Sequence, residues 1–234
     1  MKNTIQDKRK LVNSVFTTAS KKYDLMNDLM SLGIHRIWKN RLLDWMNPQP
    51  GNNIIDVASG TGNIAELFIK RVGITANVVC VEPNEEMYHY GKLNLKKFKN
   101  IKWFKDSAEK LPFKKDTFDF YTISYGIRNV SDINRTIKEA FRVLKPGGRF
   151  MCLEFSKIDN ELINLFYKNY AKVIPFVGKY VVGSSKPYEY LIESIDKFYN
   201  QEQLSELISR NGFSNVEYRN LSNGISAVHS GWKI

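Results

Sequence analysis

The sequence predicts an α/β protein with a doubly wound, mostly parallel sheet of seven strands, and three observations carry that prediction. From residue 51 onward, short apolar runs alternate with polar segments of helical length, as in parallel strands joined by crossover helices. The first run leads into a glycine loop that opens a helix. Two last apolar runs are joined by the tight-turn sequence SNG at residues 222–224, which predicts an antiparallel hairpin closing the sheet.

We expect a single domain, because 234 residues with 43% hydrophobic content can bury one substantial core. Residues 1–46 show helical spacing of apolar side chains and predict two or three N-terminal helices. The core, residues 51–156, alternates strands with helices. Its expected strands are residues 53–58, 77–82, 101–105, 118–124 and 149–155. Its clearest expected helices are residues 63–72, 84–97 and 132–144.

Two further stretches complete the chain. Residues 157–200 form an insertion that is rich in aromatic side chains and lysines. Residues 201–234 should form a helix, which Gly212 ends as a C-cap would, and the closing hairpin. These last elements are expected at residues 201–211, 215–221 and 225–229.

The formal net charge of +11 predicts a surface that attracts an anionic partner, either nucleic acid or a membrane leaflet, and charge alone does not choose between them. No apolar run reaches the roughly 18 residues that span a bilayer, and no signal peptide is recognisable. We therefore expect a cytoplasmic protein. Cys80 and Cys152 lie in apolar runs, which fits a reducing compartment, and no cysteine or histidine spacing predicts a metal site.

The first motif with chemical meaning is NIIDVASGTGNIA at residues 53–65. Gly60 and Gly62 let the backbone approach a ligand closely, where a helix N-terminus offers free N–H groups. Glu82 follows 20 residues after Gly62, at the tip of the second strand, where a carboxylate accepts hydrogen bonds from both hydroxyls of a ribose. The pattern predicts a cofactor that carries a nucleoside.

The glycine motif alone also fits a nicotinamide oxidoreductase. Asp56 precedes Gly60 by four residues and adds a negative charge that would repel a pyrophosphate but suits the amino group of a methionine moiety. We therefore expect a sulfonium cofactor. The alternative, that Asp56 and Glu82 only cap the loops behind them, is disfavoured by their joint placement.

The second motif is the polar loop KDSAEKLPF at residues 105–113, which should lie beside the adenine edge. Asp106 or Ser107 would take the adenine amino group, and the sequence leaves this choice open. An ordinary polar loop is the alternative. The third stretch, RVLKPGGR at residues 142–149, ends a helix and starts a strand, so we assign it no chemistry.

Beyond these motifs, the chain resembles the ubiquinone/menaquinone biosynthesis C-methyltransferase family of the class I methyltransferases. The likeness covers almost the whole chain, with matching stretches KYDLMNDLMSLGIHRIWK (22–39), TISYGIRN (122–129), RVLKPGGRFMCLEFS (142–156), YEYLIES (188–194) and GISAVH (224–229). The resemblance implies a Rossmann-like fold and the cofactor S-adenosyl-L-methionine. It also implies C-methylation of the aromatic ring of a polyprenyl quinol in ubiquinone or menaquinone biosynthesis.

The resemblance also assigns cofactor-binding positions. They fall on Thr61, Glu82, Ser107, Ala108 and Ser124. Three residues depart from the family pattern, because Asn63 and Glu82 replace usual aspartates and Ser107 replaces a usual asparagine. The first two keep their hydrogen-bonding ability, whereas Ser107 has a shorter reach toward the adenine.

An aromatic carbon can attack a methyl group once the neighbouring phenol loses its proton, which costs about 4 kcal/mol at pH 7 for a phenol with a pKa near 10. We expect Arg128 to stabilise that phenolate and Asn129 to orient the ring hydroxyl or a water molecule. A structural salt bridge from Arg128 to a helix carboxylate such as Asp132 is the alternative. Possible proton acceptors are Asp24, Asp28 and His35, although solvation or packing explains each of them better.

The insertion should cover the pocket for an isoprenoid tail and rest on an anionic membrane surface at the inner face of the membrane. The alternative is a core-facing amphipathic helix that Pro175 interrupts. The prediction rests on Phe166, Tyr167, Tyr170, Val173, Ile174, Phe176, Val177, Tyr180 and Val182, together with Lys168, Lys172 and Lys179.

Other classes compete with this interpretation. A different small-molecule methyltransferase or an RNA methyltransferase would use the same cofactor fold, but the chain shows no separate RNA-binding module, so we expect no nucleic-acid partner. Asp56 disfavours the oxidoreductase. The sequence leaves open the ring type, the tail length, and whether the protein acts in a homodimer or a larger biosynthetic complex.

Overall fold

The computed structural model describes residues 2–19, 25, 27–28, 31–73, 76–158, 160–162, 164–167, 169–170, 175 and 185–234. Its strands are β1 (Asn53–Val57), β2 (Asn77–Val81), β3 (Ile101–Phe104), β4 (Phe118–Ser124), β5 (Leu144–Phe155), β6 (Ser214–Leu221) and β7 (Ser226–Trp232). Its α-helices are α1 (Lys2–Ala19), α3 (His35–Met46), α4 (Asn63–Val72), α5 (Glu85–Asn94), α6 (Ile133–Val143), α8 (Lys186–Asp196) and α9 (Gln201–Arg210). A short 3-10 helix, η2 (Ile127–Asn129), follows β4.

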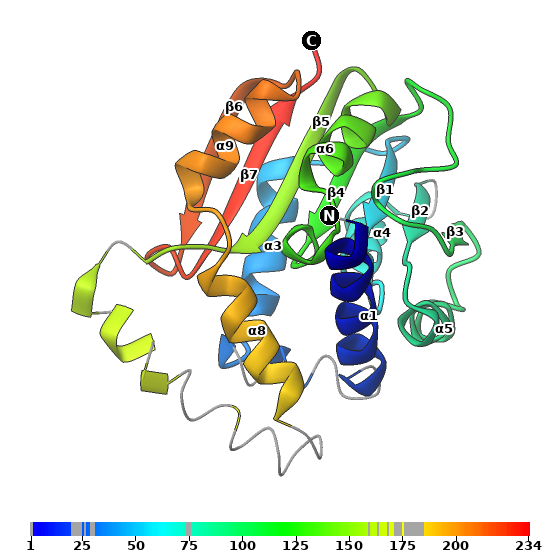
Figure 1. The fold of residues 1–234 in the computed structure, drawn as a ribbon. Coiled ribbons are helices and arrows are strands. Elements are labelled where there is room, and N and C mark those ends of the chain that lie inside the picture. The colour runs from blue at the N-terminus through cyan, green and yellow to red at the C-terminus, as the bar shows by residue number, and fades with distance from the viewer. Residues whose placement is uncertain are drawn as a thin grey trace.

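The strands form one seven-stranded sheet in the order β3-β2-β1-β4-β5-β7-β6, with helices on both faces (Figure 1). Strands β1 to β5 pair in parallel. Strand β7 is antiparallel to both of its neighbours, β5 and β6. The predicted doubly wound sheet with a closing hairpin is therefore confirmed, and the last strand in sequence is inserted between β5 and β6.

Successive residues of each central strand point into two separate cores, as the period of a strand requires. Ile54 and Cys80 pack on one face with apolar residues of α3, α4 and α8. Ile55 and Cys152 pack on the other face with α6 and α9. Because both faces are covered, the central strands are nearly continuous apolar runs.

Two strand boundaries differ from the prediction by more than one residue. Strand β5 starts at Leu144 instead of Arg149, because Leu144 pairs with Phe118 before a register shift in β4. Strand β7 continues to Trp232 because it pairs on both sides, with Arg149 and with Ser214. Pairing with a distant strand decides both boundaries.

Two helices start one residue later than predicted because their first expected residue is the N-cap. The Asn84 side chain accepts a hydrogen bond from the Met87 N–H, 3.0 Å away, and so caps α5. The Asp132 side chain accepts one from the Arg135 N–H, 2.9 Å away, and so caps α6. Both helices begin at the next residue.

The insertion is only partly described. Helix α8 lies within it and packs on the core through Tyr188, Leu191 and Ile195, so residues 186–196 belong to the globular body. Several residues that predicted the lid lie outside the described residues, namely Lys168, Lys172, Val173, Ile174, Phe176, Val177, Lys179, Tyr180 and Val182. None of the helices described is long and apolar enough to cross a bilayer.

Candidate active site

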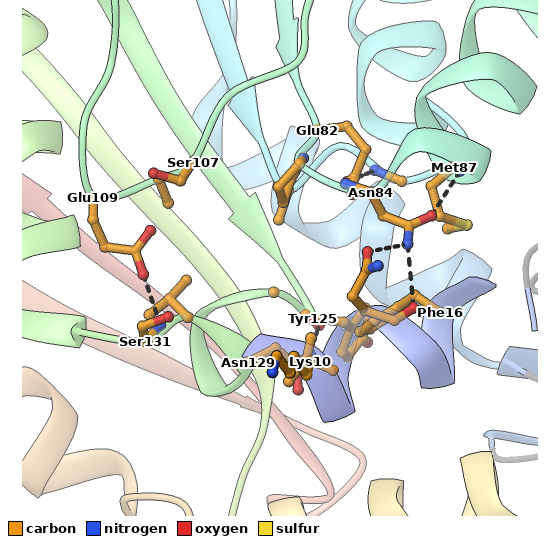
Figure 2. A pocket seen from close by; sticks show the side chains of 18 residues that line it. Lys10, Phe16, Glu82, Asn84, Met87, Ser107, Glu109, Tyr125, Asn129 and Ser131 are labelled. Carbon is orange, nitrogen blue, oxygen red and sulfur yellow. Dashed lines mark hydrogen bonds between the residues drawn. The ribbon is translucent and has the colours of Figure 1, made fainter. Parts of the chain in front are cut away.

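A cavity of about 400 Å³ opens at the carboxyl ends of the parallel strands (Figure 2). Its lining comes from the loops after β1, β2, β3 and β4 and from α1, which lies across this edge. Ligands of open α/β sheets bind in this crevice, where the strand order reverses. In this sheet the reversal lies between β1 and β4, because β2 and β3 lie on one side and β5 lies on the other.

The glycine loop connects β1 to α4 by backbone conformations that favour glycine. Gly60 has φ 56° and Gly62 has φ 83°, both in the left-handed region. Gly62 is the N-cap of α4, and the first N–H groups of a helix have no hydrogen-bond partner within the helix. Gly60 lines the cavity, whereas Gly62 shapes the turn behind it.

Glu82 follows β2 and is only 6% exposed. One carboxylate oxygen accepts a hydrogen bond from the Gly60 N–H and the other from the Asn84 N–H, each at 2.9 Å. Burial raises the pKa of Glu82 to about 7, against these two hydrogen bonds. A carboxylate has about four acceptor positions, so it retains capacity for ribose hydroxyls while it locks the glycine loop.

Asp56 lies beside a second, small hollow of about 20 Å³, roughly the volume of one water molecule. One of its oxygens accepts a hydrogen bond from Thr122 at 2.7 Å, and the other has no hydrogen-bond partner among the described residues. Burial raises the pKa of Asp56 to about 7, while the charge of Lys39, which lines the same hollow, lowers it.

Thr61 and Ser124 line this hollow as well. The buried Ser124 hydroxyl has no hydrogen-bond partner within the described chain. Thr61 accepts a hydrogen bond from the Asn63 amide at 2.7 Å, so the asparagine in place of a usual aspartate tethers the loop. An unsatisfied hydroxyl and an unsatisfied carboxylate oxygen beside the glycine loop are acceptors that suit the amino group of a methionine moiety.

The raised pKa values predict that the unliganded protein loses stability as pH rises from about 5 to 8. The folded pKa of about 7 for both Glu82 and Asp56 lies above their ordinary values of 4.5 and 3.8, so the folded state binds more protons in this window. The contribution of the two carboxyl groups to the free energy of unfolding is complete below their unfolded-state pKa values. It is lost as pH rises through about 7, the pKa of both groups in the folded state. Denaturant unfolding at several pH values would measure it, and a Glu82→Gln, Asp56→Asn variant should show a flatter profile.

The loop after β3 places Ser107 and Ala108 in the cavity lining. Asp106 is not part of that lining, and its carboxylate accepts a hydrogen bond from the Ser107 N–H at 2.8 Å. Glu109 accepts one from the Ser131 N–H at 2.7 Å and so ties this loop to the loop after β4 (Figure 2). Because only Ser107 lines the cavity, the geometry favours Ser107 over Asp106 for the contact with adenine. The contact itself stays a prediction.

Helix α1 closes one side of the cavity, and motif analysis of the sequence missed this contribution. The Asn84 side chain that caps α5 also donates, through its amide nitrogen, to the Asn13 side chain at 2.7 Å and to the Thr17 hydroxyl at 3.0 Å. Lys10 and Phe16 of α1 line the cavity. The sequence placed Asn84 at the start of a helix but not beside its α1 partners, because these are 71 and 67 residues away.

Arg128 is buried beneath the cavity and is not among its lining residues. Its guanidinium pairs with Glu154 at 2.5 Å, donates to the Tyr125 carbonyl at 2.9 Å and donates to the Ser194 hydroxyl at 3.2 Å. Burial raises the pKa of Glu154, and the neighbouring charge of Arg128 opposes that rise. Arg128 therefore does form the structural salt bridge that was the alternative interpretation, but its partner is Glu154 of β5 and not Asp132, whose side chain caps α6.

Asn129 does line the cavity. Its amide donates to the Tyr125 carbonyl at 3.2 Å, and its oxygen accepts a hydrogen bond from the Tyr190 hydroxyl at 2.9 Å. Arg128 and Asn129 are thus both tied to Tyr125 and to α8, through Ser194 and Tyr190 respectively. The side chain that reaches the cavity is Asn129, and Arg128 supports it from below.

The candidate bases do not converge on this cavity. Asp28 accepts from Arg36 at 2.7 Å and lies 2.9 Å from a ring nitrogen of His35. The hydrogen bond from Arg36 holds the pKa of Asp28 below its usual value, and burial lowers that of His35. Neither residue lines the cavity, and Asp24 lies outside the described residues.

No group of three or more metal-ligating side chains occurs among the residues that the structure describes.

A sequence model of the ubiE/COQ5 methyltransferase family matches residues 2–233. The chain belongs to that family. It is therefore a methyltransferase, and the family comparison agrees with the glycine loop and the acidic strand tip described above.

Two relatives of this family show the extent of the likeness. The ubiquinone/menaquinone biosynthesis C-methyltransferase UbiE of Rickettsia bellii is 48% identical over 97% of this chain and 94% of its own length. The protein of the same name from Cereibacter sphaeroides is 46% identical over 97% of this chain and 92% of its own.

Solved structures support the fold alone, because their sequences are distant. A methyltransferase from Thermotoga maritima, described as a possible histamine N-methyltransferase, has a TM-score of 0.67 at 21% identity and covers 95% of this chain and 100% of its own. A methyltransferase from Aquifex aeolicus has a TM-score of 0.65 at 17% identity, covering 89% and 97%. Both are described as S-adenosylmethionine-dependent, and both confirm the predicted α/β architecture.

Proposed function

We propose that this protein transfers a methyl group from S-adenosyl-L-methionine to an aromatic ring carbon of a polyprenyl quinol in ubiquinone or menaquinone biosynthesis. The observation that carries the proposal is that Glu82, Ser107 and Asn129 line the same cavity as the glycine loop. The relatives that share almost the whole chain bear the name of this activity.

The cofactor part of the proposal rests on how the residues fit its groups. Glu82 offers acceptor capacity at the ribose position, and Met87 and Ala108 add apolar surface to the cavity where the adenine would lie. Asp56 and Ser124 hold unsatisfied oxygens beside the loop, toward which an ammonium group would donate. When bound, the cofactor supplies an electrophilic methyl group.

The chemical step requires a phenolate, or a phenol that loses its proton as the carbon attacks. Asn129 is the polar group in the lining after β4, and its amide is held by Tyr125 and Tyr190. It would hydrogen-bond the ring hydroxyl and hold the neighbouring carbon in line with the methyl group. Such orientation accounts for a large part of the rate in transfer reactions.

Arg128 acts, in this proposal, as a positioning residue. Its charge is compensated by Glu154 within the protein, so its field at the ring is reduced, while its hydrogen bond keeps the Tyr125 carbonyl in place under Asn129. The direct contact between Arg128 and the phenolate that the sequence suggested stays a prediction, and the pH dependence discussed below separates the two roles.

The direct experiment supplies the purified protein with labelled S-adenosylmethionine and, separately, with a benzoquinol and a naphthoquinol that carry short prenyl chains. Methylated quinol identified by mass spectrometry, with the new methyl on ring carbon, is the expected product. A parallel incubation with bulk RNA tests the competing class. Label in RNA and none in either quinol would overturn the proposal.

Peripheral contact with a membrane is part of the proposal. Leu162, Leu165 and Phe166 follow the spacing i, i+3, i+4 of one helix face and are 69%, 58% and 75% exposed. Exposed apolar side chains on one face, on a protein with a net charge of +11, suit an anionic lipid surface on which a polyprenyl substrate resides.

We expect a Leu165→Ser, Phe166→Ser variant to bind anionic vesicles several-fold more weakly, because two apolar side chains no longer enter the lipid interface. Co-sedimentation with phosphatidylglycerol-containing vesicles measures this, and parent binding should weaken as salt rises. Leu93→Ser, at a 59% exposed leucine of α5, serves as the matched control. Equal binding by the double variant and the parent would remove these residues from the contact.

A further inference from the structure

A third cavity, of about 240 Å³, lies between α1 and α8. Val15 and Pro187 give it a buried apolar lining, and the half-exposed Leu11 adds to it. Three charged and exposed side chains also line it, namely Lys186, Glu189 and Glu193. This cavity is an apolar groove with a charged rim.

One pair of side chains connects this groove to the catalytic cavity. Tyr190 lines the groove, and its hydroxyl donates to the oxygen of Asn129, which lines the catalytic cavity, at 2.9 Å. Helix α1 is common to both, because Lys10, Asn13 and Phe16 face the catalytic cavity while Leu11, Ser14 and Val15 face the groove. The two cavities therefore share helix α1 as a wall and are connected by the hydrogen bond between Tyr190 and Asn129.

We propose that the groove between α1 and α8 binds the first isoprene units of the quinol's tail, and that the Asn129–Tyr190 pair sets the point where the tail leaves the ring. The inference rests on the proposed function and names a binding site for the tail of that substrate. A hydrocarbon chain is the occupant that the apolar lining suits, since such a chain makes no hydrogen bonds.

Cavity volume supports a separate place for the tail. A single drug-sized ligand occupies a pocket of roughly 300–1,000 Å³. The catalytic cavity, at about 400 Å³, lies near the lower end of that range and has to hold a nucleoside cofactor and a substituted ring together. The tail therefore has to leave this cavity, and the groove offers buried apolar surface beyond Asn129.

The test compares two quinols with the same ring, one with a two-isoprene chain and one with a methyl group in its place. Leu11→Glu puts a charge into the groove at a side chain that is 51% exposed, so the fold should tolerate it. We expect it to raise KM for the prenylated quinol by about tenfold relative to the short quinol. Ser14→Leu enlarges the apolar wall and should lower the same ratio about threefold.

Leu93→Glu on α5 is the matched control for an added surface charge and should leave the ratio at the parent value. Equal changes in KM for both quinols in Leu11→Glu, or an unchanged ratio in both groove variants, would overturn the tail site. A parent enzyme that methylates neither quinol gives a different result, which would overturn the proposed function and this inference with it.

Discussion

Replacing Glu82 with alanine should weaken binding of S-adenosylmethionine by about a hundredfold or more. The variant would lack the carboxylate that we propose accepts hydrogen bonds from the ribose hydroxyls, and hydrogen bonds to a charged group contribute about 1.5–3 kcal/mol each. It also releases the Gly60 N–H, now held at 2.9 Å, so the glycine loop loses its anchor. Isothermal titration calorimetry measures the affinity. With the cofactor at 100 times its Kd, the free energy of unfolding of the parent should rise by about 2.7 kcal/mol. For a chain of this length, that corresponds to a rise of roughly 5–10 °C in Tm.

Two further variants make that experiment specific. Glu82→Gln keeps the shape but offers one oxygen to two backbone N–H donors, so its affinity should lie between alanine and parent. Gly60→Val should also abolish binding, because its φ of 56° strains a β-branched residue. Gly73→Val is the control, because Gly73 has φ 81° and does not line either cavity at the glycine loop. Parent-like calorimetry for Gly60→Val and Glu82→Ala would refute the site.

Arg128→Ala should lower turnover by about a hundredfold while leaving cofactor affinity nearly unchanged. Removing the guanidinium takes away the contacts to Tyr125 and Ser194 and releases the turn that carries Asn129, a loss of roughly 3 kcal/mol in the transition state. Steady-state kinetics with the quinol and calorimetry with the cofactor measure the two quantities. Arg128→Lys should recover only part of the rate, because an ammonium cannot reproduce the fork of hydrogen bonds.

The same variant also tests how Arg128 acts. As a positioning residue, it should leave a constant ratio of parent to variant turnover from pH 7 to about 10. A direct phenolate contact would instead make the ratio shrink as the phenol, with its pKa near 10, ionises without help. A shrinking ratio would therefore restore the direct role that the sequence suggested.

Stability provides an independent reading of the Arg128 pair. Breaking a buried ion pair by removing one partner costs about 3–5 kcal/mol. Without Arg128, the pKa of buried Glu154 rises further, so the folded variant binds a proton that the unfolded chain releases. In denaturant unfolding, the loss in free energy of unfolding of Arg128→Ala relative to the parent should therefore be smaller at pH 5 than at pH 8. Arg135→Ala, at an exposed arginine of α6, should unfold like the parent at both pH values.

Most of the fold and part of the site were predictable because they depend on local sequence. The short apolar runs and the glycine loop are set within about ten neighbouring residues, and the strands appear where they indicated. Glu82 was predictable because parallel strands bring their carboxyl ends to one edge. The early start of β5 and the long β7 were missed, since both depend on pairing with distant strands.

The sequence alone determined the α/β class and placed the glycine loop and Glu82 at the carboxyl ends of neighbouring parallel strands. Only the tertiary structure decided which polar groups meet there. Asn84 meets Asn13 across 71 residues, Arg128 meets Glu154 across 26, and Tyr190 meets Asn129 across 61. Hydrophobic periodicity specifies which face of an element is buried but not the partner that a polar side chain finds, because that partner is set by how sequence-distant elements pack.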